Sequence, residues 1–160
     1  MIENIDKEAF KLENYLPYQL DYTSNFNKSF RREFQYKYIS KDITADEFAI
    51  LVALVINPEV SQSELAKILF KGKAHVGKIL NDMEDRKLIK RIADTRDNII
   101  IKKNQITDKG REIFNHGIRE AKIIENRMKN EFTENEVRQF ISYLKRFRKV
   151  LASIVDVKLK

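Results

Sequence analysis

The segment from Ser61 to Gly110 constrains the fold more than any other, because its hydrophobic pattern changes from helical to strand-like within a short distance. Two helical patterns are separated by a turn at Phe70-Lys71-Gly72, and two strand-like runs follow. We expect Leu65, Ile68 and Leu69 to point inward from the first helix, and Val76, Ile79, Leu80 and Met83 from the second. The order helix, turn, helix, hairpin predicts a winged helix-turn-helix domain.

Three capping boxes mark predicted helix starts at Thr44, Ser61 and Thr133. In each, the hydroxyl accepts from a backbone N–H three residues later, where a glutamate reaches back to the cap N–H. Asn57-Pro58 ends the helix that begins at Thr44, because the residue before proline is pushed out of helical geometry. We therefore expect helices over 44–56, 61–69 and 134–155, and a further long helix after Thr107.

A first helix is predicted from about Leu16 to Ile39, and it carries aromatic residues at every fourth position. These are Tyr18, Tyr22, Phe26, Phe30, Phe34 and Tyr38. The simplest interpretation is that the rings belong to the core, and the alternatives are a dimer interface or the wall of a ligand pocket. In the last helix, apolar residues from Val137 to Ile154 recur at coiled-coil-like spacing, so we infer a helical dimer interface.

Composition limits the chemistry of the chain. It has no cysteine, which excludes disulfides, thiol redox sensing and zinc–thiolate sites. The absence of cysteine is consistent with a protein of the reducing cytoplasm. The longest apolar run, 48–56, is far shorter than the roughly twenty residues that span a bilayer, and no signal peptide is visible. The net charge is −3 over residues 1–60 and +5 over each of 61–106 and 107–160. A basic middle and tail favour a polyanionic partner. A lysine-rich solvated surface without such a partner would give the same distribution of charge.

The second helix of the segment has an outer face suited to a DNA groove. Opposite its apolar stripe it presents Ala74, Gly77, Lys78 and Asn81, flanked by Lys73 and His75. Lysine and asparagine read base edges in the major groove, and lysine also neutralises phosphate. Gly77 costs about 1 kcal/mol in a helix interior, which either close approach to DNA or close helix packing would explain.

The strand-like runs 89–93 and 99–106 predict a β-hairpin wing with a polar turn at 94–98. Arg96 in that turn is suited to an adjacent minor groove, whose potential is negative, or it pairs with a neighbouring aspartate and stiffens the turn. The complete predicted DNA-contacting set is Ser61, Ser63, Lys71, Lys73, Ala74, His75, Gly77, Lys78, Asn81, Arg96 and Asn98.

Four stretches resemble signatures of the MarR family of bacterial and archaeal transcription regulators. In chain order they read SQSELA (61–66), DMEDRKLIKR (82–91), DTRDN (94–98) and ITDKG (106–110). The resemblance implies a dimer that binds a palindromic operator in double-stranded DNA through the helix at 73–86, with Arg96 as the wing arginine. It also implies release of DNA when a small aromatic effector binds, and we place candidate contacts to that ligand at Tyr22, Phe26, Phe30 and Phe48.

This sequence departs from the family pattern at three points. Lys87 stands where the family usually has glycine, so a positive φ there would be strained or absent. Ile99 stands where a second wing arginine is common, and the strand after the wing is about one residue longer, so the wing contacts would be weaker or differently aimed. The absence of cysteine excludes the family's thiol-based peroxide sensing.

We therefore predict a mainly α fold with a small β-hairpin wing. A winged helix-turn-helix domain spans 44–106, a helical dimerisation region spans 14–43 and 107–160, and an arm precedes them at 1–13. The predicted function is a dimeric, sequence-specific DNA-binding transcriptional repressor in the cytoplasm, without a metal or cofactor. The alternative is a winged-helix protein–protein module without specific DNA binding. An enzyme is disfavoured because no paired histidines, phosphate-binding loop, nucleophile motif or metal-ligand spacing is present.

Overall fold

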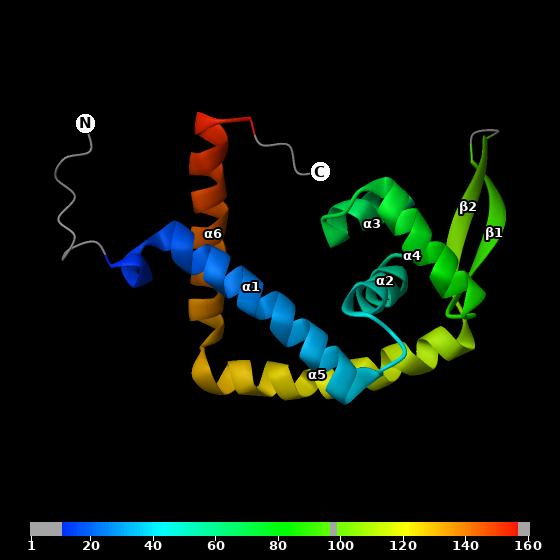
Figure 1. Ribbon diagram of the computed structural model, residues 1–160, viewed down its shortest axis with the longest axis horizontal. Helices are drawn as coiled ribbons and strands as arrows, with labels where there is room; N and C mark the ends of the chain where they lie inside the picture. Colours follow the sequence, from blue (N-terminus) through cyan, green and yellow to red (C-terminus); the bar gives the residue numbers. More distant parts are fainter. Residues whose placement is uncertain (1–10, 97–98, 157–160) are drawn as a thin grey trace. The chain divides into compact units, whose positions relative to one another are not determined.

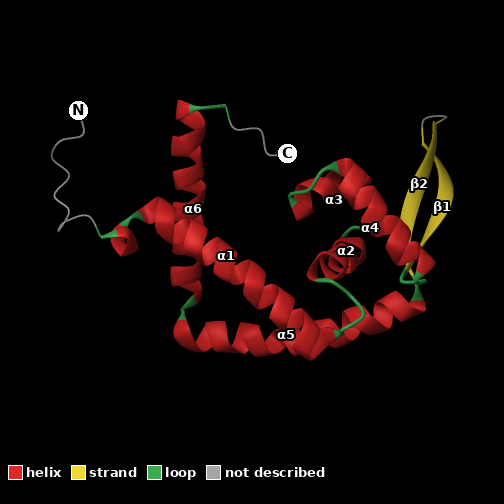
Figure 2. Ribbon diagram, viewed as in Figure 1, coloured by secondary structure: helices red, strands yellow, loops and turns green. Residues whose placement is uncertain are grey.

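A computed structural model describes residues 11–96 and 99–156 of the chain, and the side chains of 93–102 lie outside that description. The chain divides into two compact units, Met1–Ala45 and Asp46–Lys160. Helices dominate both units, and a two-stranded antiparallel sheet belongs to the second (Figures 1 and 2). This is the predicted mainly α fold with a hairpin wing.

The first unit contains η1 (Leu12–Asn14), α1 (Leu16–Phe34) and the π-helical turn η2 (Gln35–Ile39). Pro17 lies in the first turn of α1, where its missing N–H removes no helical hydrogen bond. The predicted helix over 16–39 is therefore confirmed, with a change to π geometry at its end.

The expectation that the aromatic rings of α1 belong to the core is wrong for the single chain. Tyr22 is 58% exposed and Phe26 is 65% exposed, and α1 contains no buried residue. Each step of four residues advances about 40° around a helix, so the stripe winds around α1 and one neighbouring surface cannot cover it. The rings stack along the helix instead, as Tyr18 and Tyr22 do with centroids 6.2 Å apart.

The second unit begins within α2 and continues to the C-terminus. Its elements are α2 (Ala45–Ile56), α3 (Gln62–Leu69), α4 (Lys73–Asp85), β1 (Ile89–Arg96), β2 (Ile99–Ile106), α5 (Asp108–Glu131) and α6 (Glu134–Ile154). The predicted helix starts after Ser61 and Thr133 are confirmed, and both capping boxes are formed. Figure 1 shows α2, α3 and α4 gathered beside the hairpin.

The core of this unit lies among α2, α3, α4 and the start of β1. The largest fully buried side chains are Ile50, Leu51, Leu65, Val76, Leu80, Met83 and Ile89. Burying each such side chain stabilises the fold by about 1.5–3 kcal/mol, so these elements hold one another in place. The stripe predicted on α4 is confirmed at Val76, Leu80 and Met83, whereas Ile79 is half-buried.

The inward placement of Ile68 is wrong, because its side chain is 49% exposed. The buried face of α3 is centred between Leu65 and Ala66, and Ile68 lies about 110° around the helix from that centre. Leu69 returns toward the same face and is half-buried.

The hairpin is longer than the predicted one. Its register runs from Ile89 opposite Ile106 to Arg96 opposite Ile99, so β1 continues through 94–96, where a turn was expected. β-Branched residues favour strands, and the isoleucines at 99–101 extend the ladder opposite the polar residues of β1. Asn98, predicted to contact DNA, lies outside the described residues.

Two non-glycine residues with left-handed backbone end the helices of the helix-turn-helix. Phe70 has φ 53° after α3, and Lys87 has φ 59° after α4. At Lys87, the Leu88 N–H donates to the Met83 carbonyl and the Lys87 N–H to the Glu84 carbonyl, both at 2.9 Å. This is a Schellman motif, which usually takes glycine. The positive φ that the family pattern leads one to expect is therefore present in spite of the lysine.

The ITDKG stretch joins the hairpin to α5. Thr107 Oγ1 accepts from the Gly110 N–H at 3.2 Å and donates to the Lys87 carbonyl at 2.6 Å. A Cβ built on Gly110 would lie 2.2 Å from the Leu88 carbonyl oxygen, so a side chain has no room there. This close approach explains a glycine that helix propensity alone disfavours.

Candidate nucleic-acid interface

The exposed face of α4 is small, polar and basic. Lys73, Ala74, His75, Lys78 and Asn81 are all exposed, while the opposite side of the helix is buried against the core. Lys73 and Lys78 form no ion pair within residues 11–96 and 99–156. The structure therefore brings five of the predicted residues together on one accessible surface.

Gly77 is half-buried and faces α3. A Cβ at this position would lie 2.9 Å from Gln62 Nε2, which itself donates a 2.9 Å hydrogen bond to the Lys73 carbonyl. Moving Gln62 aside would cost that hydrogen bond. Of the two explanations for this glycine, the structure favours close helix packing, and a contact of Gly77 with DNA stays a prediction.

Two other predicted residues in the second unit, Lys71 and Ser61, already have internal partners. Lys71 lies 3.1 Å from an Asp46 carboxylate oxygen, so a phosphate contact would have to compete with this ion pair. Ser61 caps α3, accepting from the Glu64 N–H at 3.2 Å while Glu64 accepts from the Ser61 N–H at 2.7 Å. Ser63 is half-buried.

Hydrogen bonds from the Ser61 backbone and hydroxyl lower the pKa of Glu64, because they favour its ionised form. The same arrangement at Thr133 lowers the pKa of Glu136 at the start of α6. A carboxylate near a helix N-terminus also interacts favourably with the helix dipole.

Arg91 connects the wing to α4, a role that the sequence did not reveal. Its backbone N–H donates to Glu84 Oε1 at 3.0 Å, and its guanidinium donates to the Gly77 carbonyl at 3.4 Å. The Arg91 side chain is 13% exposed, so solvent screens this contact little. Glu84 lies on α4 and Arg91 on β1, so the periodicity of a single helix or strand does not pair them.

A second ion pair connects α2 to the end of α4. The Arg86 guanidinium donates to the Glu47 carboxylate, whose side chain is only 7% exposed. The Lys109 ammonium at the start of α5 donates to the Arg86 carbonyl at 3.1 Å. These contacts position α4 from its C-terminal end and leave its N-terminal half free to approach a partner.

The wing extends beyond the core as a two-stranded ribbon. Arg96 pairs with Ile99 at the last described position of the ladder, and the Arg96 side chain lies outside the described side chains. The backbone therefore places Arg96 at the tip of the hairpin, and its contact with a minor groove stays a prediction.

The predicted ligand contacts lie in different parts of the chain. Tyr22, Phe26 and Phe30 are exposed on α1 in the first unit, and Phe48 is half-buried on α2 in the second.

Within the described residues, no group of three or more His, Cys, Asp or Glu side chains could hold a metal ion. Among the helices of residues 11–96 and 99–156, none has an apolar stretch of the length that spans a bilayer.

The sequence and the fold both match known transcriptional regulators. Residues 41–98 match the model of the MarR family. No curated protein matches the sequence significantly. The fold is similar to that of MepR from Staphylococcus aureus, which was solved as a complex with DNA. The two sequences are 22% identical, the match covers 87% of this chain and 98% of MepR, and the TM-score is 0.72.

Two further structures show the same fold. The MarR/EmrR family transcriptional regulator from Acinetobacter sp. ADP1 has 21% identity, covers 90% of this chain and 99% of that chain, and gives a TM-score of 0.72. PcaV from Streptomyces coelicolor was solved with its natural ligand and is 17% identical to this chain. The match covers 88% of this chain and 96% of PcaV, with a TM-score of 0.66. Residues 41–98 of this chain therefore match the MarR family model, and the chain shares the fold of these solved regulators.

Proposed function

We propose that this protein is a homodimeric, sequence-specific DNA-binding repressor that acts in the cytoplasm. The observation that carries the proposal is the exposed face of α4, where Lys73 and Lys78 flank small and polar residues beside the wing. Each copy would place residues 73–81 in a major groove, and two half-sites of a palindromic operator would lie about one helical turn apart. The structural similarity to MepR, which was solved with DNA, supports this mode.

The dimer is supported by apolar surface that the single chain leaves exposed. On α6, Phe140 is 59% exposed and Leu151 is 45% exposed, and the helix contains no buried residue. The coiled-coil-like spacing of this surface suits a second copy.

The same proposal includes a small aromatic effector that relieves repression. It would contact Tyr22, Phe26, Phe30 and Phe48, and PcaV offers a precedent for a ligand in this fold.

The test is fluorescence-anisotropy binding to DNA from the promoter of the protein's own gene, against unrelated competitor DNA across a salt series. Lys78→Ala should weaken binding and reduce the salt slope by about one unit if Lys78 contacts a phosphate. Lys145→Ala removes an exposed charge from α6 and is the matched control, with no expected change.

Other results would change the interpretation. An altered sequence preference with an unchanged salt slope would make Lys78 a reader of bases. Two results together would contradict specific recognition by α4. These are loss of binding when competitor DNA is added, and an equal affinity of the unchanged protein and the Lys78→Ala variant for the promoter DNA. Those results would favour the protein–protein module as the function of the winged-helix domain.

A further inference from the structure

Phe70, in the turn between α3 and α4, is both strained and exposed. Its φ is 53°, in the left-handed region that favours glycine, and its side chain is 73% exposed. The Phe70 N–H donates to the Lys67 carbonyl at 3.2 Å. The Lys71 N–H donates to the Ala66 carbonyl at 3.0 Å, which completes a Schellman motif. Glycine makes the same two bonds without the strain, so the backbone of this turn does not explain a phenylalanine.

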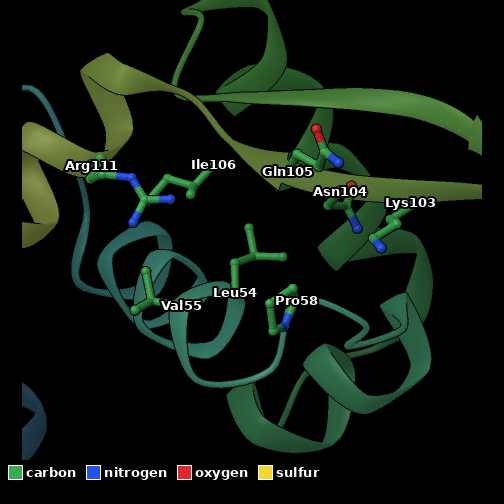
Figure 3. Close-up of a pocket in the computed structure, with 8 residues that line it drawn as sticks. All are labelled: Leu54, Val55, Pro58, Lys103, Asn104, Gln105, Ile106 and Arg111. Atoms are coloured by element: carbon green, nitrogen blue, oxygen red, sulfur yellow. The ribbon is translucent and has the colours of Figure 1, made fainter.

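Packing within the chain does not explain the ring either. The Phe70 ring has no aromatic or cation–π contact within residues 11–96 and 99–156. A Cβ built on Gly72 would meet no described atom within 4 Å, so the turn is open there. The hollow of about 280 Å³ around Asn104 lies elsewhere, because its walls come from α2, Pro58, β2 and the start of α5 (Figure 3). Residues with a strained backbone cluster at functional sites, so the ring points to a partner outside the chain.

The surroundings of Phe70 suit a polyanion. Residues 65–81 contain four lysines and no acidic residue, and Lys67 and Lys73, on either side of the ring along the chain, are exposed. Ile68 and Phe70 are the large exposed hydrophobic side chains of this stretch. A protein partner is recognised by a larger contiguous apolar patch. A small apolar area surrounded by positive charge instead complements DNA, which presents apolar groups between its phosphates.

The turn also lies close to the part of α4 that is proposed to enter the major groove. Phe70 precedes Lys73, the first residue of α4, by three residues, so their Cα atoms are at most about 11 Å apart. The major groove of B-DNA is about 12 Å wide. With Lys73 in the groove, Phe70 is therefore within reach of the groove edge, where deoxyribose rings and thymine methyl groups are the apolar parts of DNA.

We propose that the Phe70 ring packs against an apolar group of DNA at the edge of the major groove, either a deoxyribose ring or a thymine methyl group. The inference rests on the proposed function and adds to it a contact that involves no charge. Burial of the ring in the complex offsets the cost of the strained backbone, which the free protein carries alone.

The test measures stability and DNA binding on the same full-length variants. Phe70→Gly removes both the strain and the ring, so it should raise the melting temperature by about 2 °C and weaken binding to promoter DNA about tenfold. Phe70→Ala removes the ring and keeps a Cβ, so it should lose the same affinity without the gain in stability. In both variants the salt dependence of the affinity should keep its slope, because a phenyl ring displaces no counterions.

Deoxyuridine in place of thymidine distinguishes the two apolar groups, because it lacks the C5 methyl group. A methyl contact predicts that this DNA binds the unchanged protein more weakly and affects Phe70→Ala less. A sugar contact predicts no effect of deoxyuridine, with the loss in Phe70→Ala unchanged. Ile56→Ala is the matched control, since it removes a 78% exposed apolar side chain at the end of α2 and should alter neither affinity nor salt slope.

Several outcomes would overturn the proposal. Equal affinities of the unchanged protein and Phe70→Ala for promoter DNA would leave the ring without a DNA contact. A smaller salt slope in Phe70→Ala would assign the loss to displaced lysines. Each protein is measured on promoter DNA and on an unrelated duplex. An unchanged protein that does not prefer promoter DNA contradicts the proposed function, whereas the ratio of the unchanged protein to Phe70→Ala on either duplex reports on the ring. Absence of binding to both duplexes would contradict both proposals.

Discussion

At the scale of single residues, backbone conformation explains several choices that side-chain chemistry does not. Phe70 and Lys87 both occupy the left-handed region, where a residue with a Cβ costs about 1–2 kcal/mol relative to the right-handed helix. Phe70 is 73% exposed and Lys87 is also exposed, so burial of their side chains offsets little of that cost. The cost of the left-handed backbone at these two residues is therefore offset by the packing and hydrogen bonds of the surrounding helices.

Lys87→Gly should stabilise the protein by about 0.5–1 kcal/mol, because relief of the positive φ exceeds the added entropy of glycine in the unfolded chain. The measurement is the urea midpoint of unfolding. Lys87→Ala removes the same charge and side chain while keeping a Cβ, so it should give no such gain. Equal effects of the two substitutions would show that charge, and not backbone strain, sets the result.

Gly110→Ala should destabilise the protein by about 2 kcal/mol or more, because the new methyl group would collide with the Leu88 carbonyl and the Ile106 side chain. Thermal unfolding followed by circular dichroism measures this. Gly72 is the matched control, since a Cβ there meets nothing within 4 Å. Gly72→Ala should cost less than about 1 kcal/mol, and similar losses at both positions would contradict the steric explanation.

At the scale of elements, short contacts between helix ends and the hairpin position the candidate interface. Arg91 ties β1 to α4 through Glu84, and Arg86 ties α4 to α2 through Glu47. The hydroxyl and carboxylate caps define where α3 and α6 begin. Orientation of the α4 face thus depends on a few polar pairs in addition to the apolar core.

The cap of α3 should weaken in acid. Glu64 has a lowered pKa in the folded protein, so its contribution to stability is complete above the ordinary value of 4.5 and is lost as the pH falls through the lowered folded value. The protection of the amides at 62–65 against hydrogen exchange, relative to their intrinsic exchange rates at each pH, should therefore fall below about pH 4.5. Glu64→Gln, which cannot ionise, should show no such fall in protection, and an identical pH profile of protection for both proteins would refute the role of this carboxylate.

At the scale of the whole molecule, apolar surface exceeds what the single chain covers. Large exposed hydrophobic residues occur on α1, α5 and α6, among them Phe26, Ile123 and Phe140. Contiguous exposed apolar patches mark interaction sites in soluble proteins. The proposed homodimer would bury this surface, and two α4 faces would then reach two half-sites.

Leu151→Glu should shift the protein from dimer to monomer, because a charge would enter the proposed interface along α6. Sedimentation velocity across a concentration series measures the change, and the monomer should lose affinity for a two-half-site DNA. Lys145→Glu changes an exposed position of the same helix and should leave the dimer intact. A Leu151→Glu protein that sediments as the unchanged protein does would exclude α6 from the interface.

The sequence by itself determined the elements and their order, because capping boxes, Asn57-Pro58 and hydrophobic periodicity act over neighbouring residues. It also identified the exposed side of α4, since the buried side follows from helical spacing. It could not identify the ion pairs of Glu47 with Arg86 and of Lys71 with Asp46, the packing of Gly77 against Gln62, or the hollow around Asn104. Those features join residues that lie far apart along the chain, and only the tertiary structure decides which of them meet.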